Sequence, residues 1–174
     1  MNIFVIGGNE KTGEIDWVKS AQHLDNRRVV KMILESCQLL STALHLNGMS
    51  GPYKPTHKKH PSTIWTTESS ANFKNLIVHT QALIDEYHSR FNNKKHKCED
   101  ALKVIIDNFD ENKFPCQVDT PIRLAMPNEF KSDNPVKSYR DYYSTKELMT
   151  YPSNKVPNWF YKRRKIPFDV IIYS

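Results

Sequence analysis

The sequence predicts a mainly α-helical fold, and three observations favour this class. Apolar residues recur at a spacing of three and four along several stretches, which is the period of an amphipathic helix. Glycine and proline gather between these stretches rather than within them. Only residues 2–6 (NIFVI) and residues 168–173 have the short apolar character of strands. We therefore predict a compact helical domain with a small β pairing between an N-terminal and a C-terminal strand.

Length and composition suit a soluble protein. The 174 residues fit a single domain, residues 1–174, with 39% hydrophobic and 25% charged residues. No apolar run approaches the roughly 20 residues of a membrane span, and the start MNIFVIGGNEK lacks the pattern of a secretory signal. Three widely spaced cysteines indicate reduced thiols rather than a disulfide framework. We expect a cytoplasmic protein, in the host cytoplasm if the chain is viral, with no membrane partner.

Positive charge is concentrated in three clusters. The net charge is +6 and the isoelectric point is about 9.2. The clusters lie at residues 54–60, 94–97 and 162–165. Basic clusters with aromatic residues nearby suit a polyphosphate partner, because each contact releases condensed counterions. The charge pattern therefore favours nucleic acid or a nucleotide as the partner.

The central predicted element is a helix over residues 23–45, which Ser20 or Asp25 could cap. Its expected core face consists of Val29, Val30, Ile33, Leu34, Cys37, Leu40 and Leu44. Its other side carries a polar stripe of Asp25, Arg28, Lys31, Glu35, Gln38 and Thr42. A solvated surface helix has such a stripe, and so does a helix that lines a cleft and faces an anionic ligand. Spacing alone leaves both interpretations open.

The rest of the chain is expected to form shorter elements around this helix. Residues 47–61 contain two glycines and three prolines and should form a long loop. The elements expected after it are a second helix from His60-Pro61 to Phe91, a third helix at residues 99–108, an irregular but packed segment at 110–134, a helix at 135–149 and the C-terminal strand at 168–173.

Histidine and cysteine are the candidate ligands for a metal ion, and serine is a candidate nucleophile. His57 and His60, and His96 and Cys98, could supply nitrogen and sulfur ligands, but their spacing is not that of a zinc site. No Ser lies in a G-x-S-x-G turn. We predict neither a metal ion nor a cofactor.

Acid–base chemistry and anion binding have better candidates. Glu35, Glu68 and Glu86 each lie on a predicted helix beside apolar residues, where burial can tune a carboxyl pKa. Two basic groups precede or begin helices: Arg27, Arg28 and Lys31 in the leading helix, and His57, Lys58 and His60 before the second. If both helix starts face one cleft, these groups form a single phosphate clamp.

Two motifs carry a resemblance to a known family. The run LDNRRVVKMILESCQ is similar to the Leu-Asp-x-x-Arg-x-x-Lys-x-x-x-Glu-x-x-Gln run of the pyrimidine-dimer DNA glycosylases, small helical proteins of the endonuclease V type. A His-Pro…Trp motif follows at His60, Pro61 and Trp65. The segments HKC (96–98), AMPNEF (125–130), YRDYY (139–143) and VPNWF (156–160) resemble phage members of the same group.

The resemblance implies a mostly helical fold and action on a pyrimidine in DNA. In the glycosylase reaction an N-terminal α-amine attacks the sugar C1′, a glutamate assists, and a base is taken out of the stack. Glu35 is the candidate for that glutamate. The bulky Asn2 disfavours removal of Met1, which leaves the use of the amine open.

Two other functions are compatible with these residues. A related branch is associated with phage thymine hypermodification, and its members look like transferases that attach an amino acid or similar group to an activated hydroxymethyl pyrimidine. A non-catalytic nucleic-acid-binding module is the third candidate. The predicted catalytic residues are Glu35, Asp25 and His60. The predicted substrate- and phosphate-binding residues are Asn26, Arg27, Arg28, Lys31, Gln38, His57, Trp65, Glu68, Arg140 and Tyr143.

Overall fold

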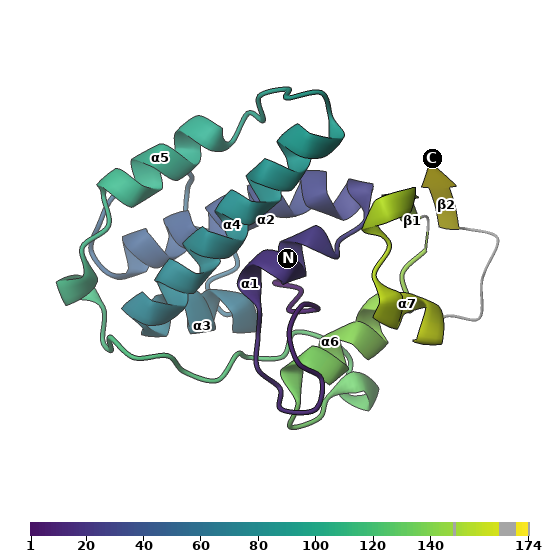
Figure 1. The fold of residues 1–174 in the computed structure, drawn as a ribbon. Helices are drawn as coiled ribbons and strands as arrows, with labels where there is room; N and C mark the ends of the chain where they lie inside the picture. Colours follow the sequence, from purple (N-terminus) through teal and green to yellow (C-terminus); the bar gives the residue numbers. More distant parts are fainter. Residues whose placement is uncertain (148, 164–169, 174) are drawn as a thin grey trace.

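Helices make up most of the molecule (Figure 1). The computed structural model describes residues 1–147, 149–163 and 170–173. The α-helices in these ranges are α1 (Trp17–Gln22), α2 (Asn26–Leu46), α3 (Pro61–Glu68), α4 (Ser70–Arg90), α5 (Glu99–Asp107), α6 (Pro135–Tyr143) and α7 (Asn158–Arg163). They are joined by the short helical turns η1 (Glu111–Lys113), η2 (Asn128–Phe130) and η3 (Ser153–Lys155) and by strands β1 (Met149–Pro152) and β2 (Val170–Tyr173). The predicted mainly α-helical class is confirmed.

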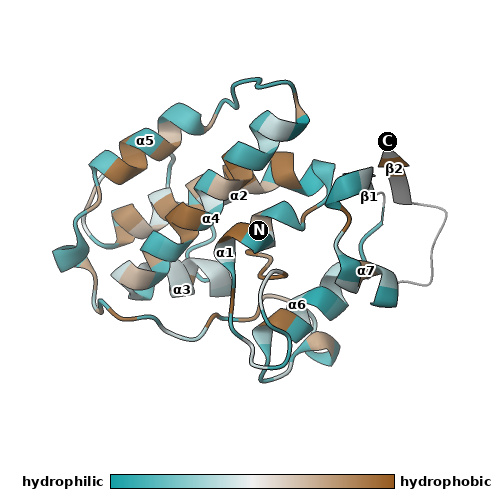
Figure 2. Ribbon diagram, in the orientation of Figure 1, coloured by the Kyte–Doolittle hydropathy of each residue, from teal (hydrophilic) through white to brown (hydrophobic). Residues whose placement is uncertain are grey.

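The central helix of the fold is α2, which packs against α3, α4, α5 and β1. Asp25 caps its start, since the carboxylate accepts hydrogen bonds from the backbone N–H groups of Arg27 and Arg28 at 3.1 and 3.4 Å. Hydrophobic residues recur along α2 and α4 in Figure 2. By length and hydropathy α2 could cross a membrane, but 61% of its most apolar window is buried inside the protein. Its apolar residues therefore form the core.

The predicted core face of α2 is only partly correct. Val29, Ile33 and Cys37 are fully buried, but Val30 and Leu34 are 36% and 40% exposed. The helices packed on α2 cover a single stripe of its surface, and these two residues lie just beyond the edge of that stripe.

The predicted second helix is interrupted. His60 caps α3 and Pro61 lies in its first turn, as expected, but the chain turns at Ser69. Ser69 has an extended backbone (φ −147°, ψ 138°), and its hydroxyl accepts a hydrogen bond from Ala71 N at 3.1 Å and donates one to Val118 O at 2.5 Å. This residue therefore ends α3 and caps α4. The third predicted helix is confirmed as α5.

The predicted β pairing between the two ends of the chain is wrong. The C-terminal strand β2 pairs in parallel with β1, from Met149↔Val170 to Pro152↔Tyr173. Residues 2–6 form no strand, and each is at most 9% exposed. The backbone of this buried segment forms hydrogen bonds with side chains rather than with a neighbouring strand. For example, Arg140 Nε donates to Ile6 O at 2.9 Å. The predicted helix at 135–149 ends at Tyr143 because β1 follows, while positions 168 and 169 of the predicted strand lie outside the described residues.

Candidate active site

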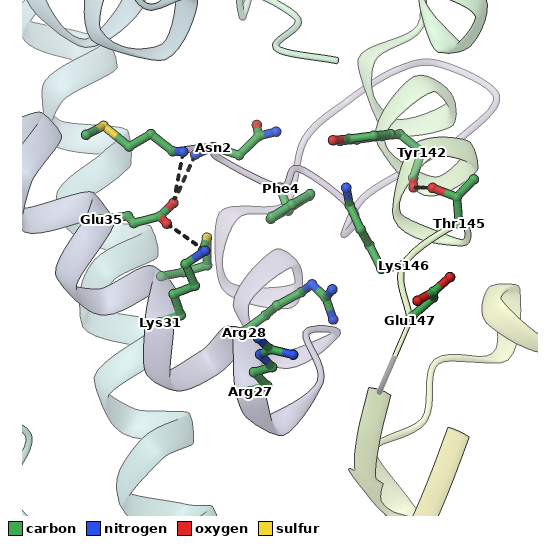
Figure 3. A pocket seen from close by; sticks show the side chains of 12 residues that line it. Asn2, Phe4, Arg27, Arg28, Lys31, Glu35, Tyr142, Thr145, Lys146 and Glu147 are labelled. Atoms are coloured by element: carbon green, nitrogen blue, oxygen red, sulfur yellow. Dashed lines mark hydrogen bonds and ion pairs between the residues drawn. The ribbon is translucent and has the colours of Figure 1, made fainter. Parts of the chain in front are cut away.

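A pocket of about 520 Å³ lies between the first half of α2 and the segment that follows α6 (Figure 3). Helix α2 forms one wall, residues 142–147 form the other, and the start of the chain runs between them. The lining residues are Met1, Asn2, Phe4, Arg27, Arg28, Lys31, Met32, Glu35, Tyr142, Thr145, Lys146 and Glu147. Part of the polar stripe of α2 therefore lines a pocket that is open to solvent.

Nitrogen groups at the start of the chain face the carboxylate of Glu35. The α-amino group of Met1 is 3.6 Å from Glu35 Oε2, and the backbone N of Asn2 donates a hydrogen bond to the same oxygen at 3.2 Å. Lys31 Nζ is 3.3 Å from the other oxygen, Oε1. The Glu35 side chain is only 12% exposed, so its charge is balanced by these neighbours more than by water. A primary amine and a carboxylate thus meet inside the pocket.

The buried segment at residues 2–6 holds the chain start in this position. The side-chain amide of Asn2 donates to Ala125 O at 2.8 Å, and its oxygen accepts from Ile3 N at 2.9 Å. Further along, the Arg140 guanidinium donates to the carbonyl oxygens of Ile6 and Gly8 at 2.9 and 3.0 Å. The amine is therefore placed by tertiary contacts far away in the sequence.

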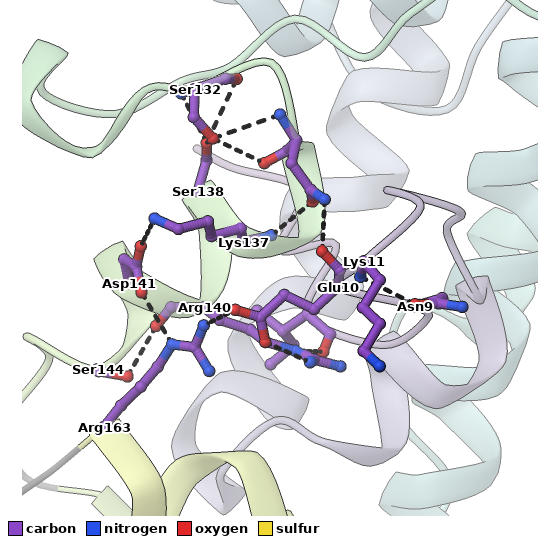
Figure 4. A network of polar contacts seen from close by, with 12 residues as sticks. Asn9, Glu10, Lys11, Ser132, Lys137, Ser138, Arg140, Asp141, Ser144 and Arg163 are labelled. Atoms are coloured by element: carbon purple, nitrogen blue, oxygen red, sulfur yellow. Dashed lines mark hydrogen bonds and ion pairs between the residues drawn. The ribbon is translucent and has the colours of Figure 1, made fainter.

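Arg140 belongs to an ion network that joins the start of the chain to α6 and α7 (Figure 4). Glu10 accepts from Arg140 at 3.1 Å and also pairs with Arg163, which donates to Asp141 at 2.8 Å. Both arginines lie over the ring of Trp159, with distances of 5.2 and 5.9 Å from the guanidinium carbon to the ring centroid. Burial raises the pKa of Glu10, but the two arginines outweigh it and hold this pKa below its usual value.

A second buried network orients Arg28 on the α2 wall. Asp25 is fully buried, and its Oδ2 accepts from Arg28 Nη1 at 2.8 Å and from the hydroxyl of Tyr143. Burial opposes the charge of Arg28, but Tyr143 and Asp25 outweigh it and raise the pKa of the guanidinium. Burial raises the pKa of Tyr143 well above its usual value, so its hydroxyl stays protonated and donates to Asp25. Asp25 thus positions Arg28 and does not itself line the pocket.

The histidine that caps α3 lies within electrostatic reach of the amine. His60 Nδ1 accepts from Ser62 N at 3.2 Å. Burial lowers the pKa of His60, the N-terminal amine and His57 lower it further, and Glu35 opposes them. The imidazole is therefore neutral at pH 7. His57 is exposed, with a positive φ of 48° and a hydrogen bond to Thr56 Oγ1 at 2.7 Å.

Comparison with models of known protein families identifies the family of this chain. The profile of the pyrimidine dimer DNA glycosylases matches residues 1–100. This chain belongs to the pyrimidine dimer DNA glycosylase family. No curated protein and no solved structure matches it. The family relationship predicted from the sequence is confirmed, and with it a glycosylase-like protein that acts on DNA.

Four of the predicted site residues line the pocket of this glycosylase-family protein: Arg27, Arg28, Lys31 and Glu35. Gln38 lies further along α2, and Asn26 accepts from Arg90 at 3.2 Å. Both are half-buried and neither lines the pocket.

The structure places the other predicted binding residues away from the pocket. Trp65 is 1% exposed, donates to Thr120 O at 3.1 Å and stacks on Trp17 with ring centroids 5.5 Å apart. Glu68 is paired with Arg123 at 2.7 Å. Arg140 and Tyr143 are buried in the two networks described above. The polar atoms of these side chains contact other groups of the same chain, so they stabilise the fold.

The sequence did not reveal the residues of the second wall. Tyr142, Thr145, Lys146 and Glu147 lie outside the residues that the family profile matches. The predicted helix at 135–149 contained all four residues. Because the helix was predicted to continue through Glu147, the turn that directs these residues to the pocket was missed. The tyrosine-rich composition of 139–143 was the only signal for this wall.

Proposed function

We propose that this protein is a DNA glycosylase with lyase activity that removes a damaged pyrimidine, with the α-amino group as nucleophile and Glu35 as acid–base catalyst. The observation that supports this proposal is the 3.6 Å approach of the Met1 amine to Glu35 Oε2 within a pocket lined by cations. An adjacent base that accepts a proton is what a primary amine needs to act as a nucleophile.

The reaction follows from the placement of these two groups. The amine nitrogen attacks C1′ of the target nucleotide while the Glu35 carboxylate accepts a proton from the nitrogen. The bond between C1′ and the base breaks, and the base leaves with the electron pair and takes a proton from water. The sugar ring opens at O4′, which receives the proton from Glu35, and an imine links the chain to C1′. Elimination of the 3′ phosphate and hydrolysis of the imine then release the protein.

The cations of the α2 wall suit the phosphates on either side of that nucleotide. The exposed Arg27 and Lys31 flank the half-buried Arg28, whose guanidinium is fixed by Asp25. A fixed guanidinium fork binds phosphate oxygens at little cost in side-chain entropy. His60 does not line this pocket, and we assign it no phosphate contact.

Borohydride trapping tests the proposal directly, because the reagent reduces the imine to a stable amine. The duplex carries a single thymine dimer, and we expect a covalent protein–DNA product whose peptide map places the link at the α-nitrogen. The intact mass of the protein identifies whether residue 1 or residue 2 carries that nitrogen. Either is suitably placed, since the backbone N of Asn2 is 3.2 Å from Glu35 Oε2.

Two variants and one control separate chemistry from binding. Glu35→Gln should reduce trapping by roughly 10²- to 10⁴-fold, the usual contribution of an acid–base group, and a Gly-Ser extension before residue 1 should abolish it. Glu129→Gln, at an exposed carboxylate in η2, should leave trapping unchanged. A mass gain on hydroxymethyluracil in DNA without any trapped product would overturn the proposal in favour of the transferase. Binding without any product would support the non-catalytic module instead.

A further inference from the structure

One tyrosine of the candidate active-site pocket has no role in the reaction proposed above. Helix α6 carries three tyrosines, at positions 139, 142 and 143. The hydroxyls of Tyr139 and Tyr143, which are fully buried, form hydrogen bonds inside the protein. Tyr142 is half-buried and lines the pocket instead. In the part of the chain that the structure describes, its hydroxyl has no hydrogen-bond partner, so this group is available to a ligand.

Two aromatic neighbours support the ring of Tyr142. The ring stacks with Phe4 at a centroid distance of 6.4 Å and an interplanar angle of 24°, and it packs against Phe130 at 5.5 Å and 47°. In Figure 3 the side chain extends from α6 with its hydroxyl end directed toward the side where Asn2 lies. A ring that its neighbours already hold in place loses little side-chain entropy when a ligand binds to it.

A cation already lies over this ring. Lys146 Nζ is 3.7 Å from the centroid of the Tyr142 ring, within the range of a cation–π contact, and Lys146 also lines the pocket. The face of the ring under the ammonium group is therefore not covered by the core of the protein. Because a lysine side chain is flexible, a flat group that enters the pocket can displace the ammonium from this face.

The rest of the pocket determines which part of a nucleotide reaches the ring. The Met1 amine meets Glu35 on the α2 wall, and Arg27 lies on the same wall. A nucleotide with C1′ at the amine and with its phosphates on α2 directs its base away from α2, because base and phosphates are attached to different sides of the sugar. The wall that it then faces contains Tyr142. The pocket volume of about 520 Å³ is within the range of small-molecule sites.

We propose that Tyr142 recognises the pyrimidine that the protein removes, an inference that rests on the proposed glycosylase function. The base lies on the phenol ring, and the hydroxyl donates a hydrogen bond to one of its carbonyl oxygens. Stacking accepts any base, whereas this hydrogen bond favours pyrimidines, which carry a carbonyl oxygen at C2, over adenine, which carries none. A thymine within a dimer is saturated at C5 and C6 but keeps both of its carbonyl oxygens. Tyr142 thus determines specificity, while the amine and Glu35 carry out the reaction.

Abasic DNA separates recognition of the base from the reaction at the sugar. A duplex with an abasic site presents C1′ to the amine without a base, and borohydride trapping is compared between this duplex and one with a single thymine dimer. Tyr142→Leu should lower the ratio of the dimer rate to the abasic rate by roughly tenfold, within the usual contribution of one stacked base. Tyr142→Phe keeps the ring and should lower this ratio only a few-fold, the usual contribution of one neutral hydrogen bond.

The matched control is Tyr161→Leu, at a tyrosine on α7 that is 51% exposed and does not line the pocket. This variant should leave the ratio unchanged. Tyr142→Phe preserves the packing against Phe4 and remains informative if thermal unfolding shows that Tyr142→Leu is destabilised. An unchanged ratio in a stably folded Tyr142 variant, whether both rates fall equally or neither falls, overturns the proposal.

A failure of the glycosylase reaction itself has a different signature. In that case the unmodified protein traps neither the dimer duplex nor the abasic duplex. The ratio of the binding affinities for the same two duplexes then tests Tyr142 in place of the ratio of rates. Equal affinity ratios in Tyr142→Leu and in the unmodified protein would show that Tyr142 does not recognise the base.

Discussion

The two walls of the candidate active-site pocket come from different regions of the chain. The α2 wall lies within the residues shared with the family and carries Arg27, Arg28, Lys31 and Glu35 on a helix with a buried cap. The opposite wall, residues 142–147, lies beyond those residues and consists of the last turn of α6 and the segment after it. One wall presents cations and the carboxylate of Glu35, whereas the other presents a tyrosine ring, a hydroxyl and one charge of each sign. The groups that we propose to react thus lie in the shared region, and the remaining region forms the surface opposite them.

The largest effect is expected where the two walls are tied together. Asp25 on α2 accepts from Tyr143 on α6, and Asp25→Ala leaves the largely buried Arg28 without its carboxylate. Loss of one partner of a buried pair costs about 3–5 kcal/mol of unfolding free energy. Chemical denaturation measures this loss. Asp16→Ala is the matched control, because Asp16 also caps a helix but its side chain is 38% exposed, and it should cost only about 1 kcal/mol. Equal losses in the two variants would show that Asp25 acts as a cap alone.

The α2 wall should account for the dependence of DNA binding on salt. Arg27 lines the pocket and is exposed, so Arg27→Ala removes a phosphate contact without unpairing a buried group. The slope of log K against log salt should become shallower by about 0.9, the value for one phosphate. Binding isotherms at several salt concentrations measure it. A slope equal to that of the unmodified protein would place the phosphates elsewhere.

The smallest effect, with the opposite sign, is expected on the other wall. Glu147 lines the pocket, and its charge repels the phosphates that Arg27 attracts. Glu147→Gln should therefore tighten DNA binding a few-fold at low salt, with the difference fading as salt screens it. Weaker binding in this variant would mean that Glu147 contacts the base rather than merely opposing the backbone.

The leading helix could be predicted well, because its evidence is local. Helical spacing located α2 and placed Arg28, Lys31 and Glu35 on one face, and Asp25 is the one of the two candidate caps, Ser20 and Asp25, that caps it. The spacing could not predict whether that face meets solvent or lines a pocket. Whether a polar stripe meets water or a pocket depends on Met1 and on residues 142–147, which join it only in the folded chain.

The incorrect predictions also have a physical cause, because they depend on contacts between segments that are far apart in the sequence. Residues 2–6 have the composition of a strand, but their backbone partners include the side chains of Arg140 and Glu35, which no local pattern reveals. Ser69 divides a pattern that reads as one helix, because its hydroxyl both caps α4 and bonds Val118 O. Trp65 was predicted to bind substrate and is instead packed against Trp17. The assignment of residues 1–174 to a single domain stays a prediction.

The contacts of Arg140 with the N-terminal segment fix the position of the amine before a substrate binds. One guanidinium binds Ile6 O, Gly8 O and Glu10, so the first ten residues are anchored before any DNA arrives. If the proposed reaction is correct, a nucleophile held in this way has already lost its translational and rotational freedom, so substrate binding does not have to supply that entropy. The effective molarity of the amine at the sugar is therefore set when the chain folds.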